Sequence, residues 1–175
     1  MADKKISALT SATTPLTGTE VLPIVQGGST VKVAVSKLNS FEPVFSAYQG
    51  SNQTVSNTTT TVINYDTVTI DTTSTYNATT KTWTPTVAGY YLINATVNPG
   101  TGTGIVTVGI KIGGATYQNG GVNSIAGTIP FQVSTIVYLD GATGVQATSY
   151  QSSGGNLTYY TTYQSQFCGA LLRAA

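Results

Sequence analysis

Apolar and polar residues alternate most regularly over residues 90–97, whose sequence is YYLINATV. One set of positions holds Tyr91, Ile93, Ala95 and Val97, and the intervening set holds Tyr90, Leu92, Asn94 and Thr96. Because successive side chains of a strand point to opposite faces, this alternation predicts a strand with one buried face. A second layer must cover that face, and apolar segments that could form it lie at 45–48, 62–70, 105–112, 131–139, 145–150, 157–163 and 167–172.

Clusters of Gly, Pro, Asn, Ser and Thr separate these segments and predict loops. The predicted loops are 49–61, 72–82, 98–104, 117–128 and 151–156. This spacing predicts about eight to ten short strands and is typical of an antiparallel sandwich or jelly roll. Neither heptads nor a fixed-period repeat is visible, so we expect no coiled-coil or collagen-like shaft.

The first 40 residues differ from the rest and predict a separate arm. Segments 19–25 (TEVLPIV) and 30–35 (TVKVAV) flank the turn sequence QGGS, which together indicate a β-hairpin. An isolated hairpin is marginally stable in water, so we expect the arm to dock on the head or on another protein rather than serve as a flexible leader. The predicted docking residues are Val21, Leu22, Pro23, Ile24, Val25, Val31, Val33 and Val35. The predicted division is an arm at 1–40 and a head at 41–175, with a junction at 36–43.

The composition agrees with an all-β protein and favours self-association. Charged residues are 7% of the chain, where about 25% is usual. Thr, Val, Ile and Tyr, which favour strands, are abundant, whereas Lys and Glu, which favour helices, are scarce. So few charges mean weak self-repulsion, which suits close packing against identical copies.

Residue types that carry catalysis are missing or scattered. The chain has no histidine, and its acids show no paired-carboxylate spacing. Cys168 therefore lacks a histidine partner for nucleophilic catalysis, and the Gly-rich run 100–104 lacks the ending of a phosphate loop. We expect no enzyme, no catalytic residue and no cofactor. Calcium could use oxygen ligands such as Asp66, Asp71 and Asp140, but we favour framework and turn-capping roles for Asp66 and Asp140, and no metal.

Charge and hydropathy argue against nucleic-acid and membrane partners. The seven Lys and Arg residues are scattered rather than gathered in a basic patch. No apolar stretch approaches the roughly 18 residues of a membrane span, and residues 6–16 are too rich in Ser and Thr for a signal peptide. One cysteine excludes an intrachain disulfide, so we expect synthesis in a cytoplasm.

Four motifs in residues 41–175 resemble the globular head of complement component one q, a jelly roll of the tumour-necrosis-factor type. They are Tyr65-Asp66-Thr67-Val68, the Tyr76 to Trp83 spacing, Pro85 with Gly89-Tyr90-Tyr91-Leu92, and the closing sequence SQFCGALL at 165–172. The resemblance implies a homotrimer with aromatic and small apolar residues packed along a threefold axis. The core and trimer framework is then expected at Tyr65, Tyr76, Trp83, Gly89, Tyr91, Phe167, Gly169 and Leu171.

Physical roles can be assigned to several of these positions. Trp83 and Phe167 are large core fillers. Gly89 is expected to permit a turn that other residues resist, and Gly169 to mark a close approach of two backbones. Cys168, where the family has a small residue such as Ser, is expected to be a buried and inert thiol.

The arm resembles the leader of many phage fibre and virion appendage proteins. The likeness is carried by KISAL at 5–9, PLTGTEVLPIVQGG at 15–28 and TVKV at 30–33. It implies a bacteriophage virion protein anchored to the capsid or another virion protein through residues 1–40 and assembled in the host cytoplasm. The trimeric knob would decorate or reinforce the capsid as a head fibre or cement protein.

An alternative function is a receptor-binding knob on a short tail or head fibre. Loops 49–60, 114–128 and 150–156 would then attach to a host surface glycan or protein. Tyr117, Tyr150 and Tyr159 are the candidate ligand-facing residues, with Tyr160 and Tyr163 nearby in the chain. Core or trimer-interface positions are the competing interpretation, and the one we favour, because tyrosine suits both apolar and polar neighbours.

Overall fold

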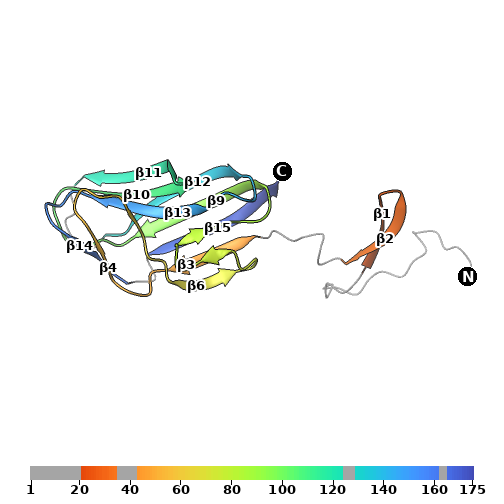
Figure 1. Ribbon diagram of the computed structural model, residues 1–175, viewed down its shortest axis with the longest axis horizontal. Coiled ribbons are helices and arrows are strands. Elements are labelled where there is room, and N and C mark those ends of the chain that lie inside the picture. Colours follow the sequence, from red (N-terminus) through yellow and green to blue (C-terminus); the bar gives the residue numbers. More distant parts are fainter. Residues whose placement is uncertain (1–20, 35–42, 124–128, 162–164) are drawn as a thin grey trace, which may run out of the picture. The chain divides into compact units, whose positions relative to one another are not determined.

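In the computed structural model the described residues are 21–34, 43–123, 129–161 and 165–175, and all of their regular structure is β-strand (Figure 1). The all-β prediction is therefore confirmed. None of these residues belongs to a helix that could cross a membrane. The chain divides into two units, Met1–Ser40 and Phe41–Ala175, which correspond to the expected arm and head.

In the arm, β1 (Val21–Gln26) and β2 (Ser29–Ala34) form the predicted antiparallel hairpin. Its two-residue turn is Gly27-Gly28, with φ of 59° and 80°. Two successive positive φ values match the turn that follows the natural twist of a hairpin, and glycine adopts them without strain.

Two sheets stack face to face in the head (Figure 1). The five-stranded sheet has the order β12-β9-β15-β3-β6, and the six-stranded sheet has the order β11-β10-β13-β8-β7, with β5 also paired to β13. The first contains β3 (Val44–Tyr48), β6 (Thr67–Asp71), β9 (Gly89–Val97), β12 (Phe131–Leu139) and β15 (Gln166–Ala174). The second contains β5 (Thr61–Val62), β7 (Tyr76–Asn77), β8 (Thr82–Trp83), β10 (Ile105–Ile112), β11 (Ala115–Asn123) and β13 (Val145–Gln151). A small sheet pairs β4 (Gln53–Val55) with β14 (Leu157–Tyr159).

Strand β9 is an interior strand of the five-stranded sheet and has the buried face that its alternation predicts. It is hydrogen-bonded to β12 on one side and to β15 on the other. Tyr91, Ile93, Ala95 and Val97 point into the core and are fully buried. The sandwich core therefore forms between this face of β9 and the apolar positions of β10 and β13, including Val106, Val108 and Ile110.

The expected loop at 117–128 is wrong over residues 117–123, where β11 pairs with β10 through a Gly113-Gly114 turn. Residues 124–128 lie outside the described residues. The glycines that suggested a loop serve packing instead, because a Cβ on Gly120 would approach the Gln132 carbonyl oxygen to 2.9 Å. Close contact of this edge with β12 thus requires glycine within a strand.

The predicted strand 62–70 is also corrected, because the chain changes sheets within it. Its first part, β5, pairs with β13, and its last part, β6, pairs with β3. Ile63 and Tyr65 lie at the crossing and are buried, and the Tyr65 N–H donates to the Ile63 carbonyl oxygen at 3.1 Å. The expected loops 49–61 and 72–82 contain the short strands β4, β7 and β8.

Candidate interaction surfaces

A cluster of aromatic side chains packs between the two sheets and holds them together. Phe45 stacks on Trp83 with ring centroids 5.3 Å apart, and Phe167 meets Phe45 edge-on at 5.2 Å. Tyr91 packs edge-on against Trp83 at 5.6 Å. Such pairs contribute about 0.5–1.5 kcal/mol each beyond the apolar area that they bury. Trp83 and Phe167 are fully buried, Leu171 is buried and Tyr76 is partly buried beside them.

Two framework glycines act differently from the sequence-based expectation. A Cβ on Gly169 would overlap the ring of Trp83, so the close approach is to an indole and not to another backbone. A Cβ on Gly89 would overlap the Arg173 carbonyl oxygen and lie 2.8 Å from Leu171 Cδ1. Gly89 begins β9 and does not have the positive φ of a glycine turn. Lack of space, and not turn conformation, therefore requires glycine at both positions.

The framework tyrosines Tyr65, Tyr76 and Tyr91, together with Tyr159, combine buried or partly buried rings with hydrogen-bonded hydroxyls. The Tyr65, Tyr76 and Tyr91 hydroxyls donate to the carbonyl oxygens of residues 96, 65 and 87 at 3.0, 2.7 and 2.6 Å. Tyr159 shares a 2.7 Å hydrogen bond with Ser149 Oγ. Burial raises the pKa of Tyr65 and Tyr76 well above the usual value, and that of Tyr91 and Tyr159 to about 12.

We expect these tyrosines to make the protein sensitive to alkali. A pKa raised by folding means that stability is fully present below the unfolded pKa of about 10 and is lost as pH rises through the folded value. The unfolding free energy should therefore fall steeply above about pH 10. Tyrosinate absorbance should show Tyr65, Tyr76, Tyr91 and Tyr159 ionising only as circular dichroism reports unfolding. Ionisation of all eleven tyrosines near pH 10 in a folded protein would contradict this expectation.

The candidate calcium ligands Asp66 and Asp140 are occupied by hydrogen bonds within the protein. Asp66 accepts from Gly50 N and Ser51 Oγ at 2.6 and 2.7 Å. Partial burial would raise the pKa of Asp66, but these hydrogen bonds together lower it. Asp140 caps its turn by accepting from the N–H groups of residues 142 and 143 at 2.9 and 2.7 Å, which lowers its pKa. Framework and capping roles are thus observed for these two residues.

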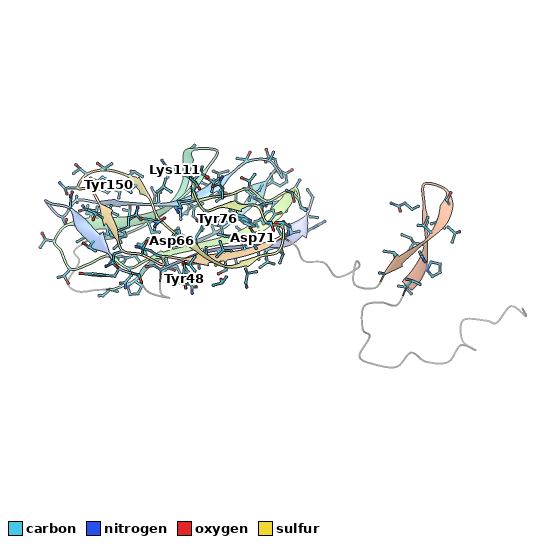
Figure 2. All side chains as sticks on the ribbon, turned by 60° about the horizontal axis from the view of Figure 1, so that its bottom comes forward. Tyr48, Asp66, Asp71, Tyr76, Lys111 and Tyr150 are labelled. Atoms are coloured by element: carbon cyan, nitrogen blue, oxygen red, sulfur yellow. The ribbon has the colours of Figure 1, made fainter. Side chains whose placement is uncertain are left out.

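Asp71 lies apart from Asp66 along the sheet edge, as Figure 2 shows. Its carboxylate accepts from the backbone N–H groups of Tyr76 and Thr73 at 2.8 and 3.3 Å. In the described part of the chain no three His, Cys, Asp or Glu side chains gather as metal ligands. Asp66, Asp71 and Asp140 therefore each organise a loop through hydrogen bonds of their own.

The outer face of the five-stranded sheet carries an exposed apolar surface that the sequence-based candidates missed. Its members align in registered rows, with Ile136 beside Leu92, then Ala170 and Val44, and with Tyr138 beside Tyr90. Ile136 and Leu92 are 59% and 40% exposed, and the Tyr90 and Tyr138 rings meet edge-on at 5.7 Å. Leu172 and Ile70, on neighbouring strands, are exposed as well. The sequence does contain a sign of this surface: in 90–93 and 136–139 the residues are apolar or aromatic on both faces of the strand, so one face must be apolar and exposed or covered by a partner.

Cys168 lies on this outer face and is only half-buried, which corrects the expectation of a fully buried thiol. The residue lines an open depression of about 290 Å³ together with Val44, Ser46, Leu92, Asn94 and Ala170. Burial raises the pKa of its thiol, so the protonated and weakly nucleophilic form dominates at neutral pH. The expectation of an unreactive thiol therefore stays a prediction, now with a physical reason.

The three candidate ligand-facing tyrosines do not come together. Tyr159 is fully buried, which excludes ligand contact through its ring. Tyr150, labelled in Figure 2, is half-buried on β13 opposite Thr107. Tyr117 is exposed at the β11 bulge, between the residues paired with Ile110 and Lys111. Tyr160, the next residue after the buried Tyr159, is exposed instead. Tyr163 lies outside the described residues.

In the arm, apolar residues are exposed on a hairpin that has little core of its own. Leu22 lies opposite Val33, and Ile24 lies opposite Val31. These four residues share one face, because the positions alternate along both strands. Val21, Val25 and Pro23 lie on the other face and are exposed as well. Val35 lies outside the described residues.

Two solved structures with this fold are similar to the head. The globular domain of zebrafish complement 1qA covers 77% of this chain and all of its own, with 15% identity and a TM-score of 0.56. The Eiger tumour necrosis factor of S. frugiperda covers 75% of this chain and 92% of its own, with 12% identity and a TM-score of 0.59. No protein family model and no curated protein matches the chain. At these identities the likeness establishes the fold: the head is a jelly roll of the complement and tumour-necrosis-factor type.

Proposed function

We propose that the protein is a bacteriophage virion component, a homotrimeric knob that is anchored by residues 1–40 and decorates or reinforces the capsid. The exposed apolar rows on the five-stranded sheet are the observation that carries this proposal. Isolated apolar residues are common on protein surfaces, but a contiguous apolar patch marks an interface. We propose that this face packs against two further copies of the same chain.

Three arguments support identical copies as the partners. The row of Ile136, Leu92, Ala170 and Val44 carries no charged residue, and the row of Tyr138 and Tyr90 ends at a single charge, Arg173 on β15, so like-charge repulsion between copies is small. The head has the jelly-roll fold, and its motifs resemble a family of threefold assemblies. A closed ring of three chains buries the apolar face of every chain. An open head-to-tail row of three would leave apolar surface exposed to water at both of its ends.

The arm supports attachment to a particle. Its hairpin presents Leu22, Ile24, Val31 and Val33 on one face, and a two-stranded sheet this exposed gains stability by docking. The phage-leader sequences in the same segment give the partner its class, a capsid or other virion protein. An added strand pairing or an apolar groove on that protein would cover the hairpin.

We expect changes in the hairpin to remove the protein from particles without affecting the head. In the full chain, Ile24→Asp with Val31→Asp places two charges on the apolar face, whereas Lys32→Gln is a matched change on the opposite face. Particles produced with each variant, purified and quantified by mass spectrometry, should lose the double variant almost completely and keep Lys32→Gln. The light-scattering mass should be the same for both. Equal incorporation of the double variant, or absence of the unaltered chain from particles, would contradict virion anchoring.

A further inference from the structure

One end of the head is formed by loops that are fixed by two buried glutamines. Gln151 Nε2 donates to the carbonyl oxygens of Val55 and Gly155 at 3.0 and 2.9 Å, and its Oε1 accepts from Ser153 N at 2.7 Å. Gln49 Nε2 donates to the carbonyl oxygens of residues 51 and 159 at 2.9 and 3.0 Å. Both side chains are fully buried. These bonds hold the loops around 51–57 and 151–161 in defined positions, and the Gly100 N–H, which donates to the Thr158 carbonyl oxygen at 2.7 Å, ties the 98–104 loop to them.

Tyr160 is the exposed aromatic residue of this loop end. Its N–H donates to the Asn98 carbonyl oxygen at 3.0 Å, and the following N–H, of Thr161, donates to Asn52 Oδ1 at 2.8 Å. The ring lies over Gly100, since a Cβ there would come within 3.1 Å of Tyr160 Cε2. Gly100 is buried, whereas Tyr160 is 41% exposed. One side of the ring is thus supported by the protein and another faces solvent.

The loops around Tyr160 carry polar, uncharged side chains, and the one carboxylate that contacts them, Asp66, is occupied by Gly50 N and Ser51 Oγ. Segments 49–65, 91–110 and 141–172 contain no Asp, Glu, Lys or Arg. Thr161 follows Tyr160 in the chain, Asn52 is bonded to the Thr161 N–H, and Thr101 follows Gly100; these exposed residues offer amide and hydroxyl groups. Tyrosine supplies rigid amphipathic contact area, and Ser, Gly and Asn supply adaptable hydrogen bonds at low entropic cost. A ligand that matches has apolar C–H faces, many hydroxyls and no charge.

We propose that Tyr160, supported by Gly100, is the stacking platform of a binding site for neutral glycans at the loop end of the head. A pyranose ring places its C–H face on the phenol ring and its hydroxyls against Asn52, Thr101 and Thr161. Because the loops are already fixed by Gln49 and Gln151, binding loses little conformational entropy. The site is contained within one chain, so it does not depend on virion anchoring or on trimer formation.

The test is saturation-transfer NMR with the full chain and three neutral probes, maltotriose, cellotriose and chitotriose. At least one probe should receive saturation at its ring C–H protons. Tyr160→Ala should weaken that binding about tenfold, which is the scale of one lost aromatic contact. Tyr160→Trp, which keeps a stacking ring, should retain binding. Val68→Ala shortens a similarly exposed side chain on β6 and should leave the signal unchanged.

Two results would overturn the proposal. One is an absence of saturation transfer to all three probes from a folded, unaltered chain. The other is a signal that survives in Tyr160→Ala or is lost equally in Val68→Ala. Folding of each variant is checked by circular dichroism, and because Tyr160 is exposed its removal should leave the thermal midpoint within about 2 °C, as surface substitutions usually do. The virion experiment above has a separate readout, so failure of one proposal leaves the other standing.

Discussion

Replacing Leu92 and Ile136 together by lysine should convert the proposed trimer into a folded monomer. The two residues are registered neighbours on β9 and β12, and both side chains point out of the sandwich. In a monomer the lysines would be solvated, and the fold would keep its stability. In an interface each one would place a charge among apolar groups, and an unpaired buried charge costs about 3–5 kcal/mol. Since every 1.4 kcal/mol is about tenfold in affinity, association should weaken by several orders of magnitude.

A matched control separates this effect from a general effect of added charge. Tyr117→Lys places the same side chain on the six-stranded sheet, at a residue about as exposed as Leu92 and Ile136. It should leave the light-scattering mass unchanged, while the double variant gives the mass of one chain. Circular dichroism should show that both variants remain folded. A double variant that keeps the mass of the unaltered protein would exclude this face as the interface.

Replacing Gly169 by alanine should destabilise the head more than most single-methyl changes. The new Cβ would overlap the Trp83 ring and lie 3.0 Å from Ile93 Cδ1. The indole cannot move aside, because Phe45 stacks on it and Tyr91 packs against its edge. Overpacking of a dense core costs about 1–3 kcal/mol, and we expect the upper end of that range. At about 2–4 °C per kcal/mol the thermal midpoint should fall by roughly 6–12 °C.

Gly155→Ala is the matched control, because a Cβ at that position meets nothing within 4 Å and the residue does not have a positive φ. Its midpoint should stay close to that of the unaltered protein at the same chain concentration. Trp83→Phe combined with Gly169→Ala should recover part of the loss, since a phenyl ring leaves room for the methyl group. Equal midpoints for the two alanine variants would show that the contact with Trp83 does not restrict position 169.

The sequence predicts the fold well where one physical signal dominates. Strict alternation at 91–97 identifies β9, and the single tryptophan, Trp83, is the expected centre of the core. The prediction fails where one residue type can serve two structural purposes, as glycine does in loops and in closely packed strands. Gly120 and Gly121 suggested a loop, yet they lie in β11, where Gly120 permits close contact with the Gln132 carbonyl.

The interaction surfaces are harder to predict, because exposure depends on neighbours that are distant in the chain. Tyr159 and Tyr160 are adjacent and chemically identical, but β14 directs one into the core and leaves the other in solvent. Leu92 and Ile136 occupy positions that alternation assigns to the solvent side, and only pairing of β9 with β12 unites them. The sequence thus indicates which residues can form a surface, and the register decides which of them do.

The mass of the full chain in solution tests the central claim most directly. Light scattering at micromolar concentration should give about three times the 18.1 kDa of one chain. A mass of 18.1 kDa over the same range would contradict the account, because the apolar rows of the five-stranded sheet would then remain in contact with water.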